Sequence, residues 1–138
     1  MRDINRIMLH CSATVEGKDY SVDTIRKWHV EGRGWSDIGY HYVIHLDGSV
    51  SQGRPLDRSG AHTKGHNKDS IGICYIGGLD ADKKPKDTMN PEQNTAFRML
   101  VLGIRTLFGN DITIHGHNEF ANKACPSFIV KEKFFDMY

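Results

Sequence analysis

The sequence predicts an α/β fold, a single domain with a central mixed β-sheet flanked by about three helices, and three observations predict it. The chain has 138 residues, which is the length of one compact domain. Short apolar runs typical of strands alternate with segments of helical periodicity. The composition, 38% hydrophobic and 25% charged, is that of an ordinary globular protein. No Pro/Gly/Ser-rich stretch is long enough to be a linker, so we interpret residues 1–138 as one domain.

Five segments of the chain are expected to form the strands. Residues 7–10 form a short apolar run that ends in Ser-Ala-Thr. Residues 39–46 and 49–52 suit two strands joined by a tight Asp-Gly turn. Residues 70–76 are apolar enough for a central strand, and residues 111–115 are rich in β-branched side chains. Alternation along 39–46 predicts one face with Tyr40, Tyr42, Ile44 and Leu46, and another with His41, Val43 and His45.

Three segments are expected to be helical. The first begins after a possible N-cap at Ser21 and ends at Gly32 or Gly34. The second has the strongest signals: Asn90, Pro91 and Gln93 form a capping-box pattern, an apolar face follows, and a glycine ends it at position 109. Residues 128–138 are expected to form the third helix. The polar segment 53–69 is predicted to be a long functional loop.

Charge and cysteine content exclude several classes of function. The net charge is +1, from 18 basic and 17 acidic residues, which gives no electrostatic case for nucleic acid or an anionic membrane as a partner. The three cysteines favour reduced thiols or metal ligation over a disulfide framework. The first residues carry charge and no apolar run has signal-peptide or membrane-spanning length. We therefore expect a protein made in the cytoplasm, with no signal peptide and no membrane insertion.

The chain is rich in histidine, with eight residues of this type, and histidine is a common metal ligand and general acid/base. A catalytic zinc site has three protein ligands and an open fourth position. His10, Cys125 and either His115 or His117 lie at or after expected strand ends. The spacing alone does not choose between the last two. It also leaves open that His10 bonds a backbone carbonyl and that Cys125 only fills space.

Several segments together resemble a known family. They are Leu9-His10-Cys11-Ser12-Ala13-Thr14, Gly39-Tyr40-His41-Tyr42, residues 60–67 (GAHTKGHN), residues 70–74 (SIGIC), Gly116-His117-Asn118-Glu119, and Lys123-Ala124-Cys125-Pro126-Ser127. In this order they resemble the type-2 N-acetylmuramoyl-L-alanine amidases, which include small phage lysozyme-amidases and the peptidoglycan recognition proteins. The resemblance runs over essentially the whole chain. The fold that it implies, a mixed sheet flanked by three helices, agrees with the prediction from the residues.

The resemblance implies a set of roles. It implies that His10, His117 and Cys125 bind Zn²⁺, that Tyr40 and Lys123 are catalytic, and that the substrate is peptidoglycan, cut between N-acetylmuramic acid and L-alanine. Zinc polarises a carbonyl and makes water more acidic. A phenol and an ammonium group can stabilise the tetrahedral oxyanion. On its own, however, Tyr40 suits a core aromatic and Lys123 a solvated loop charge.

Other residues of these motifs have two interpretations each. His62 resembles a position in the substrate groove, but it also suits a surface histidine. Asn67 can bind substrate or cap a turn. Glu119 can orient a zinc ligand or cap its loop. Cys11 follows His10 directly, so alternation predicts that its side chain points away from the site.

Three hypotheses for the function follow. The first is a zinc amidase that cuts peptidoglycan, acting as a monomer and made as a phage or prophage endolysin that reaches the wall by a separate route. The second is a non-catalytic peptidoglycan-binding module, against which the presence of Cys125 and Tyr40 argues. The third is a thiol peptidase with Cys125 as its nucleophile, which a chelator would leave active.

Overall fold

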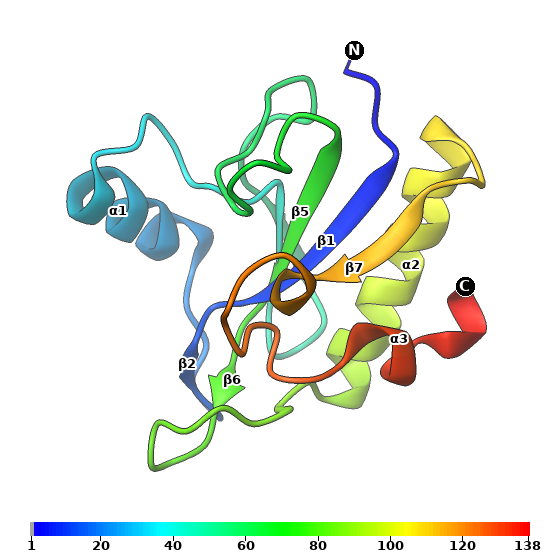
Figure 1. Cartoon of the computed structure of the whole chain (residues 1–138). Helices are drawn as coiled ribbons and strands as arrows, with labels where there is room; N and C mark the ends of the chain where they lie inside the picture. Colours follow the sequence, from blue (N-terminus) through cyan, green and yellow to red (C-terminus); the bar gives the residue numbers. More distant parts are fainter. Residues whose placement is uncertain (1) are drawn as a thin grey trace.

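A five-stranded mixed sheet forms the centre of the computed structural model, which describes residues 2–138 (Figure 1). Its strands lie in the order β4-β3-β5-β1-β7; β3, β5, β1 and β7 are parallel, and β4 is antiparallel to β3. The strand bounds are β1 (Arg6–Cys11), β3 (Tyr42–Ile44), β4 (Val50–Gln52), β5 (Ser70–Tyr75) and β7 (Thr113–Gly116). Two short strands that the sequence analysis missed, β2 (Thr14–Val15) and β6 (Gly78–Leu79), pair separately.

Three α-helices flank the sheet, which confirms the predicted fold class. They are α1 (Val22–Arg33), α2 (Pro91–Phe108) and α3 (Val130–Lys133), and two 3-10 turns, η1 (His117–Glu119) and η2 (Phe135–Met137), complete the structure. In Figure 1, α1 lies on one side of the sheet, and α2 and α3 lie on the other. None of the helices formed by residues 2–138 combines the length and the apolar character needed to cross a bilayer.

Helix α2 covers the larger core. It begins as predicted, because the Asn90 side chain and the Gln93 side chain cap each other's backbone N–H groups. The buried Gln93 amide also donates to the carbonyl of Ile76 at 3.0 Å, which fixes the start of the helix on the sheet. The buried side chains of this core come from α2 (Phe97, Val101, Ile104), from β1 and β5 (Ile7, Leu9, Ile71, Ile73, Tyr75) and from α3 (Val130).

Because side chains alternate along a strand, β1 and β5 present a different set of residues on the opposite face. Met8 and His10 of β1, and Gly72 and Cys74 of β5, are the residues between the α2-facing ones. Helix α1 packs at this side through Ile25, in a smaller core with Ile38, Val43 and Ile76. His10 therefore lies on the sheet face that α2 does not cover.

The predicted alternation along residues 39–46 is only partly correct. Tyr42 and Ile44 pack toward α2, whereas Val43 packs toward α1, as expected. Tyr40 and Leu46, however, pack with the α1 core. The reason is that the regular strand spans only Tyr42–Ile44, so the two-residue alternation does not extend to the positions outside it.

The predicted C-terminal helix over residues 128–138 is wrong in extent. The chain forms the single turn α3, and then the 3-10 turn η2. The break falls at Phe134, which is fully buried and whose ring packs 4.8 Å from that of Phe97. Burial of this aromatic ring against α2 outweighs the helical preference of the segment.

The predicted loop 53–69 crosses the α1-facing side of the sheet and is held by side-chain bonds to its backbone. The guanidinium of Arg54 donates to the carbonyls of Ile38 and Ser59 at 3.0 and 2.7 Å. The buried imidazole of His41 accepts the N–H of Gly72 on β5 at 3.0 Å, and its other nitrogen donates to the carbonyl of Arg58 at 2.8 Å. Arg2 donates to four more carbonyls, those of Leu56, Asn67, Lys68 and Ser70.

The neutral state of His41 predicts a loss of stability in mild acid. Burial lowers the pKa of His41 from 6.5 to about 4 in the folded protein. As the pH falls below 6.5, His41 therefore binds a proton in the unfolded chain but not in the folded protein. The free energy of unfolding decreases as a result, down to about pH 4. Linkage gives about 2 kcal/mol of lost unfolding free energy at pH 5 from this one group.

Urea denaturation of the wild type and of His41→Gln, at pH 7.5 and at pH 5, measures this effect. Glutamine keeps a donor and an acceptor but does not titrate, so the variant is expected to lose less stability between the two pH values than the wild type. Equal losses in the two proteins would show that His41 is not the group responsible.

Candidate metal and catalytic site

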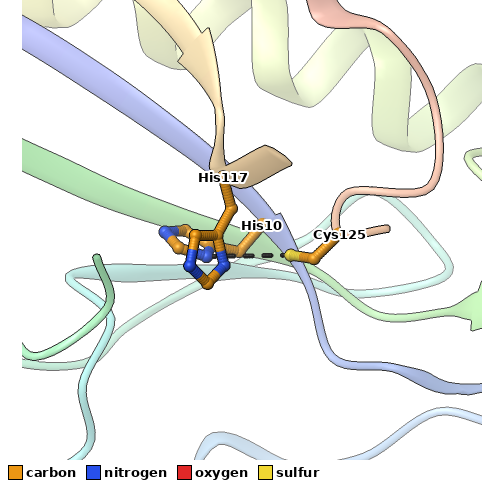
Figure 2. Close-up of side chains that lie close together, drawn as sticks. All are labelled: His10, His117 and Cys125. Carbon is orange, nitrogen blue, oxygen red and sulfur yellow. Dashed lines mark hydrogen bonds between the residues drawn. The ribbon is translucent and has the colours of Figure 1, made fainter. Parts of the chain in front are cut away.

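Two histidines and one cysteine converge at one end of the sheet (Figure 2). Each of His10, His117 and Cys125 offers one ligand atom, and these three atoms lie within 4.8 Å of one another. The Nδ1 atom of His10 is 3.7 Å from the Sγ atom of Cys125. In a tetrahedral zinc site the ligand atoms are about 3.3–3.6 Å apart, so these side chains need only a small adjustment to bind one ion.

The three residues come from segments that the fold brings together. His10 lies near the carboxyl end of β1, and His117 follows the carboxyl end of β7, the neighbour of β1. Cys125 lies in the loop between η1 and α3, and the N–H of Asn118 donates to its carbonyl at 2.8 Å. Ligand sites of open α/β sheets typically form at the carboxyl ends of parallel strands.

Hydrogen bonds of Glu119 decide between the two interpretations of this residue and between His115 and His117. Glu119 accepts the N–H of Gly116 at 2.7 Å, and its other carboxylate oxygen pairs with His115 at 2.9 Å. Glu119 is therefore the cap of its turn. His115 is thereby directed away from the metal group, and the structure places His117 in that group instead.

Burial keeps His10 neutral, as a ligand requires. His10 is 1% exposed, and burial, assisted by the nearby His62 and His117, lowers its pKa well below the usual value. Burial is the larger cause of a lowered pKa at His117, and the positive charge of Lys123 lowers this pKa further. Both imidazoles are thus uncharged at neutral pH and their ring nitrogens are available to a metal.

Cys11 lies outside the metal group, as alternation predicts, but its backbone contacts the cysteine ligand. The N–H of Cys11 donates to the Sγ atom of Cys125 at 3.2 Å. A hydrogen bond of this kind stabilises a thiolate. The side chain of Cys11, together with burial, nevertheless outweighs this hydrogen bond and raises the pKa of Cys125 in the metal-free protein. Metal binding at Cys125 therefore has to release a proton.

A groove of about 450 Å³ leads to the metal group. His117, His62, Asn67 and Lys123 line it, as do Arg33, Trp35, Ala61, Thr63 and Lys64. Asn67 also caps its own turn, because its Oδ1 atom accepts the N–H groups of His62 and Thr63, each at 2.9 Å. A larger and more apolar groove lies elsewhere, between β4 and α2, and among residues 2–138 no metal-ligand cluster lies in it.

The two expected catalytic side chains differ in environment. The ring of Tyr40 lies 5.2 Å from that of His10 and 5.4 Å from that of His29. Burial raises the pKa of Tyr40 well above its usual value, so its phenol stays protonated and can donate a hydrogen bond. Lys123 is exposed and lines the groove beside His117. The Nδ1 atom of His29 accepts the N–H of Gly39 at 2.9 Å.

Sequence reasoning missed part of the groove. Arg33, Trp35 and Lys64 line it, and the guanidinium of Arg33 lies 5.2 Å from the ring of Trp35. The only local signal was an aromatic residue directly after the glycine that ends α1. Thr63, buried beside His10 and His62, was also missed.

Comparisons with known proteins show which family the chain resembles. Residues 1–128 match the family model described as N-acetylmuramoyl-L-alanine amidase. The endolysin of Klebsiella phage KP32 is 41% identical over 130 residues, which cover 94% of this chain and 85% of that protein. Peptidoglycan-recognition protein SC1a of Drosophila melanogaster is 30% identical over 107 residues, covering 76% and 55% of the two chains. The structure of the amidase LysC of Clostridium intestinale is 27% identical with a TM-score of 0.79, covering 97% and 87%.

These findings define the class of protein as an amide hydrolase with an α/β amidase fold. More particularly, the chain belongs to the N-acetylmuramoyl-L-alanine amidase family and is a peptidoglycan amidase. The resemblance of its motifs to this family is confirmed.

Proposed function

We propose that the chain is a zinc-dependent endolysin of a phage or prophage, which cuts the amide between N-acetylmuramic acid and L-alanine. The observation that carries this proposal is the convergence of His10, His117 and Cys125 at a groove. Two imidazoles and one thiolate are a donor set that zinc prefers, and three protein ligands leave a fourth position for the reaction. Its ligands would be these three residues.

Zinc bound there would polarise the scissile carbonyl and make water a nucleophile at neutral pH. The residues of the chain would do the rest. Tyr40, whose phenol is protonated, donates a hydrogen bond to the oxyanion that forms when the amide is attacked. Lys123 reaches the same region from the exposed side and adds a positive charge.

The groove suits an anionic, partly apolar substrate. Arg33, Lys64 and Lys123 contribute positive charge to its lining, and Trp35 contributes a flat apolar surface. Stem peptides carry free carboxylates and sugars stack well on aromatic rings, so both parts of peptidoglycan find complementary groups here. In this proposal His62 and Asn67 belong to the wall of the substrate groove.

Digestion of purified peptidoglycan tests the reaction. An amidase is expected to release free amines with no new reducing ends, and a chelator is expected to stop the release until zinc is restored. New reducing ends would indicate a glycosidase. Activity that survives complete metal removal would favour a thiol peptidase with Cys125 as nucleophile. Binding without any release of amines would favour the peptidoglycan-binding module.

We infer that the protein acts as a monomer, is made in the cytoplasm and reaches the wall through a separate release pathway. Sedimentation of the pure protein tests the first point. Co-expression with a membrane pore tests the release pathway, because cells are expected to lyse only when the pore is present.

A further inference from the structure

The metal-facing histidine His10 has a second ring nitrogen, and the chain supplies specific partners for it. Its Nδ1 atom faces Cys125 at 3.7 Å. Its Nε2 atom lies 3.0 Å from the Nδ1 atom of His62 and 3.2 Å from the Oγ1 atom of Thr63. A neutral imidazole has one proton, so a His10 that ligates through Nδ1 must carry that proton on Nε2. The Nε2–H group then donates toward His62 and Thr63.

The partners of His62 fit the role of acceptor. If its Nδ1 atom accepts from His10, its proton is on Nε2, which lies 3.4 Å from the Oγ atom of Ser70. The hydroxyl of Ser70 in turn donates to the carbonyl of His66 at 2.7 Å. The Thr63 hydroxyl lies 3.1 Å from the Nδ1 atom of His62, so it contacts both imidazoles. With this arrangement of protons, the donors of His10, His62 and Ser70 each have an acceptor, and the series ends at the carbonyl of His66.

The ring of His62 fits in its position because two of its neighbours are glycines. The imidazole lies over Gly72 of β5 and beside Gly60, and a Cβ atom at either glycine would collide with it. The side chain is buried, with 8% exposure. The backbone is fixed as well, because Asn67 accepts the N–H groups of both His62 and Thr63. Neither the ring nor its segment can move far without breaking these contacts.

We propose that His62 and Thr63 are positioning residues that hold His10 in the tautomer and orientation required of a metal ligand. This inference rests on the proposed zinc site. Outer partners of metal-bound histidines typically contribute ~10–100-fold to metal affinity. His62 would thus serve the site mainly through His10, although one part of it lines the groove.

The zinc dissociation constant, measured by competition with a chromophoric chelator, tests the proposal without any use of activity. His62→Leu removes the acceptor and is expected to weaken zinc binding by ~10–100-fold. His62→Asn places an oxygen close to the position of Nδ1, so it should recover a large part of the loss. Thr63→Val, which is nearly isosteric, is expected to weaken binding about tenfold, at the lower end of that range. Thr106→Val is the matched control, because Thr106 is exposed on α2 and bonds only the carbonyl of Leu102.

Nitrogen-15 NMR of the imidazoles provides a second readout that does not depend on zinc. In the metal-free wild type, both His10 and His62 are expected to carry their protons on Nε2. A proton on Nδ1 of either ring would overturn the inference. The inference would also be overturned if all three folded variants, His62→Leu, His62→Asn and Thr63→Val, bound zinc with the affinity of the wild type. A wild type that binds no zinc would instead refute the proposed function.

Discussion

Replacing Cys125 by serine is expected to remove zinc from the protein and to lower the amidase rate by more than about 100-fold, since the loss of an outer partner alone costs 10–100-fold. The reason is the loss of the thiolate, the one anionic ligand among His10, His117 and Cys125. Serine is far less acidic, and its oxygen reaches less far toward His10 than the sulfur at 3.7 Å. Binding to peptidoglycan should remain measurable, because the groove residues are unchanged.

Zinc content after dialysis and the rate of amine release are the two measurements for Cys125→Ser. Cys74→Ala is the control for the loss of a buried thiol, because Cys74 is fully buried on β5 and outside the metal group. It should keep one zinc per chain. A Cys125→Ser protein with full zinc content and full activity would remove Cys125 from the ligand set.

The sequence predicted best where the signals are local. Helix α2 begins at the expected position because Asn90 and Gln93 cap each other within four residues, and it ends at the expected glycine. The C-terminal helix failed for the opposite reason. Phe134 is fixed by contacts with Phe97, 37 positions earlier in the chain, and no local pattern contains that information.

The metal site shows the same limit. Spacing could not separate His115 from His117, because both lie at the end of the same strand, only two residues apart. The resemblance to the family chose His117. The structure adds the physical reason, which is that Glu119 pairs with His115 and caps the turn that begins at His117.

The partners of His10 were beyond sequence reasoning. His62 and Thr63 are more than 50 residues away, and only the parallel pairing of β1 with β5 brings their loop against His10. The groove residues Arg33 and Trp35 likewise reach the site from the end of α1. A sequence can identify such residues as polar or aromatic, but their shared site depends on long-range packing.

Replacing Tyr40 by phenylalanine is expected to lower kcat by about 100- to 1,000-fold, the usual cost of losing one oxyanion donor. KM should change by less than about threefold, because the bond from the phenol strengthens only as negative charge develops on the carbonyl oxygen. The ring itself should be retained, since it packs between His10 and His29 at 5.2 and 5.4 Å. Steady-state kinetics on a soluble muropeptide measures both parameters.

Tyr42→Phe is the matched control for this prediction. Tyr42 is two residues further along the chain, and it packs on the opposite face, toward α2. Both substitutions remove one phenolic hydroxyl, so their effects on general stability should be similar, and only Tyr40→Phe should affect turnover. If the two variants turn over substrate at the wild-type rate, the role of Tyr40 is to pack against His10. If Tyr40→Phe alone is slow while its zinc content is unchanged, the hydroxyl of Tyr40 acts in the reaction itself.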